Sequence, residues 1–128
     1  KEQSSWRSIA AERLAALRQY EAGWDGTDSQ PVSPNALNRA GRLLELAFDS
    51  VEFPAPPAAV PCSDGSLQLE WWLTDVSFEL VIEADSSVSA IAENRLSSEE
   101  VEVQGEAAIN LLLQWAKRLT ADKLIPSD

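Results

Sequence analysis

The chain has 128 residues and no histidine, and its 21 acidic and 10 basic side chains give a formal net charge of −11. Its length suits one domain, and 45% hydrophobic with 24% charged residues is typical of a folded protein. The lack of histidine excludes a Ser-His-Asp triad, a Cys-His pair and any histidine-containing metal site. We therefore expect a single folded domain, residues 1–128.

The acidic residues are concentrated in the middle of the chain. Residues 49–106 contain thirteen acids and one base, Arg95, whereas residues 1–48 are neutral overall. A segment this acidic repels phosphate, so we expect no direct binding to nucleic acid. It attracts cations and basic protein surfaces instead. The alternative interpretation is a charge excess that only keeps the protein in solution.

Cysteine usage and the N-terminal residues bear on the compartment. Cys62 is the only cysteine, which excludes an internal disulfide and favours a reducing cytoplasm. Residues 1–10 are polar and lack the apolar segment of a secretory signal. No apolar run approaches the ~20 residues that a membrane span needs. We expect a cytoplasmic protein that does not bind membranes.

Two helices are expected in the first part of the chain. The first begins after Ser4 or Ser5 and ends at Gly23, a typical left-handed C′ residue. Its inward stripe consists of Trp6, Ile9, Ala10, Leu14, Leu17 and Tyr20, with Arg13 at the edge. Ser33 followed by Pro34 predicts the start of the second helix. That helix carries Leu37, Ala40, Leu43, Leu44, Ala47 and Phe48. We expect the two to pack as an antiparallel hairpin.

Beyond the prolines at 54, 56 and 57 the hydrophobic period changes to two, which predicts strands. We expect strands over 58–63, 67–73, 76–83 and 88–93, and we leave 94–104 open because acids surround its alternating valines. If Thr74 and Asp75 form a tight loop, Trp71 pairs with Phe78 and Leu69 with Leu80 on the inner face. A last helix is expected over 105–120, with Ala108, Leu111, Leu112, Trp115 and Leu119 inward. The order ααββββα predicts an α+β fold with helices covering an antiparallel meander.

The outer face of this meander is the first candidate for partner binding. The predicted register places Trp72 opposite Ser77 and Glu70 opposite Glu79, and like charges directly opposite destabilise a sheet. A partner's Lys or Arg would neutralise these carboxylates, with Trp72 as an aromatic anchor. The candidate residues are Glu70, Trp72, Glu79, Glu83 and Glu93, with Glu99, Glu100 and Glu102 as a second acidic patch. The alternatives are an ordinary solvated face, or a further element covering Trp72.

Catalysis and metal binding are disfavoured by the residues available. A Glu70/Glu79 pair could hold Mg²⁺ or Ca²⁺, or hydrolyse a glycoside, but both need a concave site and a meander face is flat. Cys62 has no histidine to act as its base, and the lysines of a Ser-Lys dyad would lie near the termini. No phosphate-binding glycine loop or calcium-binding loop is present. We therefore expect no enzyme, no cofactor and no metal.

The segment Gly23-Trp24-Asp25-Gly26 is the most distinctive tetrapeptide. As structure, Gly23 ends a helix, Trp24 covers the helix crossing, and Asp25 bonds nearby amides in a turn. As function, Trp24 and Asp25 are contact residues on an exposed loop.

Two fragments resemble a loose group of small bacterial proteins of unassigned function. They are Gly23-Trp24-Asp25-Gly26 with Pro31-Val32-Ser33, and Asp64-Gly65 with Leu67-Gln68-Leu69-Glu70-Trp71, within roughly residues 10–90. The group's loop often continues Tyr-Gly-Ala, whereas this chain has Thr27-Asp28-Ser29. The resemblance implies a bacterial or phage origin and a small α+β fold, and it supplies no catalytic residues.

These observations favour a non-enzymatic protein whose acidic sheet binds a basic, nucleic-acid-handling partner and inhibits or neutralises it. A phage anti-defence (anti-CRISPR-like) inhibitor acting as a partial nucleic-acid mimic, an antitoxin and an immunity protein all fit that description. The alternative is a domain that binds a small ligand or a divalent cation between the helical hairpin and the sheet. A third is a structural subunit that buries Trp72 in a homodimer.

Overall fold

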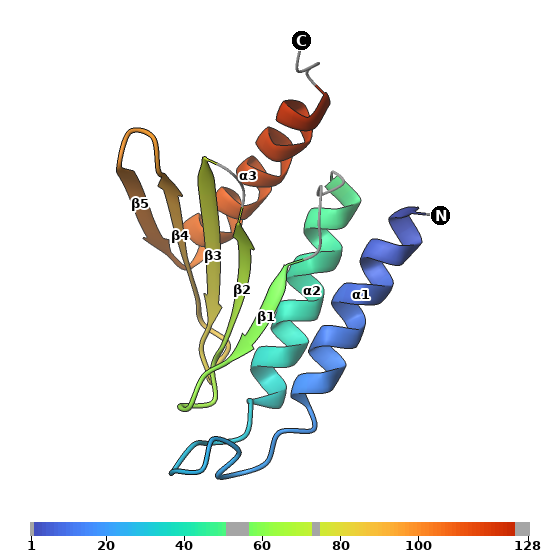
Figure 1. Ribbon diagram of the computed structural model, residues 1–128, viewed down its shortest axis with the longest axis vertical. Helices are drawn as coiled ribbons and strands as arrows, with labels where there is room; N and C mark the ends of the chain where they lie inside the picture. Colours follow the sequence, from blue (N-terminus) through green and yellow to red (C-terminus); the bar gives the residue numbers. More distant parts are fainter. Residues whose placement is uncertain (1, 51–56, 73–74, 125–128) are drawn as a thin grey trace.

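A computed structural model describes residues 2–50, 57–72 and 75–124, and the side chains of 8–47, 57–72 and 75–115. The elements follow the order α1, α2, five strands and α3 (Figure 1). All three helices lie on one face of the sheet, and no described helix covers the other (Figure 1). The fold is α+β, as predicted, with one strand more than expected.

Helix α1, Glu2–Leu17, ends earlier than predicted. The amides of Arg18 and Gln19 bond the carbonyls of Ala15 and Ala16, three residues back, so the chain tightens and leaves the helix. Gly23, predicted to end the helix, lies instead inside the following loop with φ +78°. The expectation failed because the apolar spacing extends to Tyr20, which lies outside the helix. On the helix itself, Ala10 and Leu17 are buried, and the exposed Arg13 donates from Nη1 to the carbonyl of Pro57 at 2.6 Å.

Helix α2, Pro34–Ser50, begins where the sequence predicted. The Ser33 hydroxyl accepts a hydrogen bond from the amide of Ala36 at 3.3 Å, which is N-cap geometry. The same hydroxyl donates to the carbonyl of Ala84 at 2.7 Å, which ties the start of α2 to the turn over residues 83–87. The expected inward residues are buried: Leu37, Ala40, Leu43, Leu44 and Ala47. α2 runs antiparallel to α1 beside it, as expected for the hairpin (Figure 1).

The sheet is an antiparallel meander with the strands in sequence order. Its strands are β1 Ala58–Pro61, β2 Leu67–Trp72, β3 Val76–Ile82, β4 Val88–Asn94 and β5 Glu99–Gln104. The predicted register of β2 and β3 is confirmed, with Trp71 opposite Phe78 and Leu69 opposite Leu80. β5, in the segment left open, pairs with β4 at the sheet's edge. Its acidic residues are compatible with a strand because an edge strand is protected by charge.

Helix α3, Glu106–Leu124, packs across β4 and β5 and beside α2. It buries Ala108, Leu112 and Trp115, and the ring of Trp115 lies 5.4 Å from that of Phe78 between centroids. Phe48 and Leu119, both predicted to face inward, have side chains outside the described residues. Leu73, Pro54 and Pro56 also lie outside the described residues. No helix in the described part of the chain is long and apolar enough to cross a membrane.

Candidate functional site

The face of the sheet away from the helices carries the predicted carboxylates. Successive side chains of a strand alternate between faces, so the residues between the buried ones of β2, β3 and β4 all point outward. We call the outward cluster of β2–β5 the acidic face, and it consists of Glu70, Trp72, Glu79, Glu93, Glu100 and Glu102. These strands place no Lys or Arg on it. What was predicted as two patches is therefore one surface, without Glu99.

Two pairs of glutamates lie directly opposite each other on the acidic face. Glu70 opposes Glu79 across β2 and β3, and Glu93 opposes Glu100 across β4 and β5. Glu102 opposes Ile91, an apolar residue. Partial burial and then the negative charge of Glu70 raise the pKa of Glu79 above its usual value of 4.5. The fold thus holds Glu79 where burial and the charge of Glu70 disfavour its ionisation.

Trp72 is the large apolar side chain of the acidic face, and 64% of it is exposed. Its indole Nε1 donates a hydrogen bond to Oε1 of Glu70 at 3.1 Å. The guanidinium carbon of Arg95 lies 5.7 Å from the centre of the Trp72 ring, within cation–π range. Sequence reasoning did not connect Arg95 with this site. The signal available was its position as the one base in an acidic segment, two residues after Glu93.

Glu83 and Glu99 lie apart from the cluster that we call the acidic face. Glu99 pairs with Asn94, which pairs with Val76, so all three belong to the helix-covered side of the sheet. Sequence reasoning grouped Glu99 with Glu100 and Glu102 because 94–104 had no predicted register. Glu83 follows the last residue of β3, about 20 Å along the strands from the end that carries Trp72. It lies near Cys62 instead.

Trp24 and Asp25 are engaged in the structure of their own loop. The Trp24 ring packs edge-on against Tyr20, with centroids 5.1 Å apart, and its Nε1 donates to the carbonyl of Gln30 at 2.8 Å. Oδ1 of Asp25 accepts hydrogen bonds from the amide and the hydroxyl of Thr27, at 2.9 and 2.8 Å. These bonds account for both residues as turn formers.

The same turn chemistry occupies two further aspartates. Asp64 accepts from the amide and hydroxyl of Ser66, and Asp85 accepts from those of Ser87. Hydrogen bonds to the charged form lower the pKa of each aspartate below 3.8: for Asp25 from Ser29 and Thr27, for Asp64 from Ser66, for Asp85 from Ser87. Part of the acidity of the chain therefore serves its turns, whereas the glutamates of the acidic face belong to strands.

Cys62 is not prepared for nucleophilic chemistry. Burial first, and then the charges of Asp64, Glu83 and Glu79, raise the pKa of its thiol above 9.0. A protonated thiol is a poor nucleophile. No group of three or more acidic or cysteine side chains that could hold a metal ion occurs among the described residues.

Comparison with protein-family models, with curated proteins and with solved structures gives no match to this chain. The resemblance to the group with the Gly-Trp-Asp-Gly loop stays a prediction.

Proposed function

We propose that this is a non-enzymatic binding protein whose acidic face docks on the basic surface of a nucleic-acid-binding protein and blocks it. An anti-defence inhibitor, an antitoxin and an immunity protein each act in this way. One observation carries the proposal: two directly opposed glutamate pairs lie beside a 64%-exposed tryptophan on a sheet face that no described helix covers.

A cationic partner would relieve the repulsion between the glutamates of each opposed pair. Like charges directly opposite each other on a sheet cost a few tenths to about 1 kcal/mol per pair. A partner's Lys or Arg placed between Glu70 and Glu79 would turn that repulsion into attraction. Surfaces built to hold phosphate offer such side chains at high density. The net charge of −11 would speed the encounter and make it sensitive to salt.

The neighbourhood of Trp72 already accommodates one guanidinium. Arg95 lies over the indole ring while the indole nitrogen is bonded to Glu70. A ring, a cation and a carboxylate are thus combined within the chain itself, and a partner's arginine would use the same chemistry. Trp and Arg are the residues that most often dominate interface energies. Trp72 is therefore the anchor in this proposal, and the glutamates set orientation and salt dependence.

Self-association through the same face is disfavoured by its charge. A two-fold dimer would place the acidic face of one copy against that of another, and carboxylates would meet carboxylates. Direct binding to nucleic acid or to an anionic membrane surface meets the same repulsion. We place the protein in the cytoplasm, where its lone Cys62 stays reduced.

The test compares two double variants with the same change in charge. Glu70→Lys/Glu79→Lys alters the acidic face, and Glu12→Lys/Glu21→Lys alters exposed positions on α1 and the loop after it. The immobilised proteins are incubated with host extract at low and high salt, and the recovered proteins are identified by mass spectrometry. The purified partner is then tested for DNA or RNA binding by fluorescence anisotropy with increasing amounts of each variant.

We expect the wild type and the control variant, Glu12→Lys/Glu21→Lys, to recover a basic nucleic-acid-binding protein at low salt and to displace its nucleic acid. The face variant should lose at least about tenfold in affinity, since charge-assisted contacts are worth ~1.5–3 kcal/mol each. Equal affinity of the two variants would overturn the assignment of the face. A partner that is bound but keeps its nucleic acid would overturn the inhibition.

A further inference from the structure

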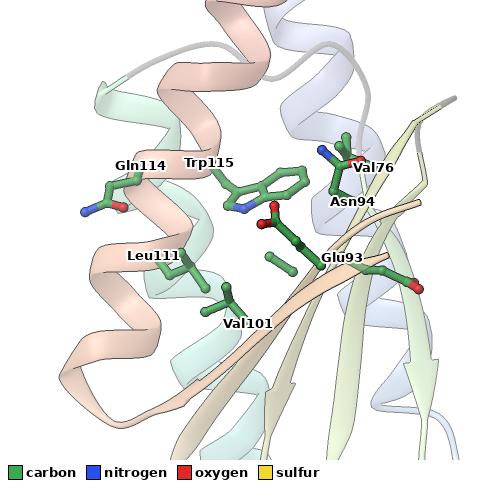
Figure 2. Close-up of a pocket in the computed structure, with 9 residues that line it drawn as sticks. Val76, Glu93, Asn94, Val101, Leu111, Gln114 and Trp115 are labelled. Atoms are coloured by element: carbon green, nitrogen blue, oxygen red, sulfur yellow. The ribbon is translucent and has the colours of Figure 1, made fainter. Parts of the chain in front are cut away.

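A cavity of about 220 Å³ lies where α3 crosses the ends of β3, β4 and β5, on the helix-covered side of the sheet. Its apolar walls include Val76, Val101, Leu111 and Trp115. Figure 2 shows the Trp115 ring projecting from α3 toward the strands, with Leu111 and Val101 below it. The small-ligand alternative placed its site between the helical hairpin and the sheet, whereas this cavity is formed by the third helix.

The polar part of the lining is acidic and neutral. Glu99 and Asn94 are opposite each other at the end of the β4–β5 pair and belong to the side that α3 covers. Gln114 of α3 and Glu93 also border the cavity, and none of the described lining residues is basic. Glu99 thus brings a carboxylate to a cavity that has both polar and apolar walls and also contains an indole ring.

This combination recognises an organic cation with an apolar stem. The charged group pairs with the carboxylate, the stem lies along Val76 and Leu111, and the indole face adds cation–π attraction. A divalent metal ion needs several oxygen ligands, and the described residues gather no such set.

The size of the cavity limits the ligand to a small one. Pockets for drug-sized molecules hold about 300–1,000 Å³, and this cavity is smaller. At about 30 Å³ per water-sized group it accepts roughly seven non-hydrogen atoms. A butylammonium ion fits, and so does the end of a lysine side chain.

We propose that the cavity binds a primary alkylammonium group, carried by a free amine or by a lysine side chain of another protein. Glu99 pairs with the ammonium, the indole of Trp115 adds cation–π attraction, and Val76 and Leu111 contact the alkyl stem. The site does not rest on the proposed function, because Glu99 lies on the opposite side of the sheet from the acidic face. Glu93 is the residue of the acidic face that also borders the cavity. Either proposal can fail while the other holds.

The experiment is an NMR titration of the ¹⁵N-labelled full chain with n-butylammonium, with n-butanol as the neutral control of similar size. We expect saturable shifts of the Trp115 indole and of amides around Asn94 and Glu99. The affinity for butanol should be lower by at least about tenfold, because the charge-assisted contact is lost. Nα-acetyl-lysine N-methylamide forms a second arm. Binding as tight as that of butylammonium assigns the site to a protein lysine, and binding of butylammonium alone assigns it to a free amine.

Two matched variants test whether Glu99 supplies the carboxylate that pairs with the ammonium group. Glu99→Gln and Glu100→Gln remove the same charge from neighbouring exposed positions of β5 that face opposite sides of the sheet. Glu99→Gln should weaken butylammonium binding about tenfold, and Glu100→Gln should change it less than about twofold. Equal effects of the two variants, equal affinity for butanol and butylammonium, or no saturable shifts around Trp115 would each overturn the proposal. Cooperative denaturation with a midpoint no lower than that of the wild type verifies that each variant is folded.

Discussion

The two faces of the sheet share the same strands and differ in what constrains them. The inner face is covered by helices, and its side chains on β2, β3 and β4 are almost fully buried except Val76 and Asn94, with Leu69 and Leu80 at 0% exposure. The outer face is covered by no described helix and carries glutamates in opposed pairs. Packing dictates the residues of the inner face, since a buried position must be apolar and must fit. No packing requirement selects glutamate over lysine or threonine on the outer face, so its composition is the better indicator of function.

The largest expected effect comes from the inner face. Phe78 is 2% exposed and lies between Trp71 and Trp115, with ring centroids at 5.7 and 5.4 Å. Phe78→Ala removes a ring from the centre of the core and should lower the free energy of unfolding by about 3–5 kcal/mol. The measurement is urea denaturation followed by circular dichroism.

Val81→Ala is the matched control on the same strand. Val81 is half-buried on the outer face. Its truncation should cost less than about 1 kcal/mol, because only part of the removed surface is shielded from water. Similar losses for the two variants would contradict the difference between the faces, and would mean that something covers the outer one.

The same contrast explains how far the sequence predicts this structure. The alternation over 67–82 predicts register as well as strands, because slipping by one residue would move every apolar side chain of β2 to the wrong face. The apolar pattern does not predict the edge strand β5, since Val101 and Val103 are its only apolar residues and Val101 itself is 48% exposed. The apolar spacing does not predict the end of α1 either, because Tyr20 keeps the helical spacing while it packs on Trp24 in the loop.

The candidate site was predictable where it depends on that register. Glu70, Glu79 and Trp72 share a face because the apolar alternation of β2 and β3 fixes the register in which the two strands pair. Glu99 could not be placed, because its side of the sheet depends on how the chain returns after Asn94. The stacking of Arg95 on Trp72 depends on that return as well, and the cavity beside Trp115 depends on how α3 crosses the strands. Neither leaves a local pattern in the sequence.

A smaller effect of opposite sign is expected on the outer face. Glu79→Gln removes the charge that opposes Glu70 and should raise the free energy of unfolding by a few tenths to about 1 kcal/mol. Glu102→Gln removes an equal charge from a position that faces Ile91, and should change stability less. Urea denaturation at low salt gives the difference, which added salt should reduce. If Glu102→Gln stabilises the protein as much, the gain comes from the net charge and the opposed pairs have no special cost.

The smallest effect is a difference in pH dependence between the acidic face and the turns. Partial burial and Glu70 raise the pKa of Glu79 above 4.5, so just above that pH the folded chain binds more protons than the unfolded one, and stability falls as pH rises. The hydrogen bonds from Ser66 lower the pKa of Asp64 below 3.8, so its contribution is present above 3.8 and is lost as pH falls through the folded value. Denaturation from about pH 3 to about pH 7 should therefore show that Glu79→Gln flattens the profile above 4.5, and Asp64→Asn flattens it below 3.8. If the Glu79→Gln profile runs parallel to that of the wild type above pH 4.5, the negative charge of Glu70 does not shift the pKa of Glu79. The electrostatic argument for a cationic partner at that pair would then be lost.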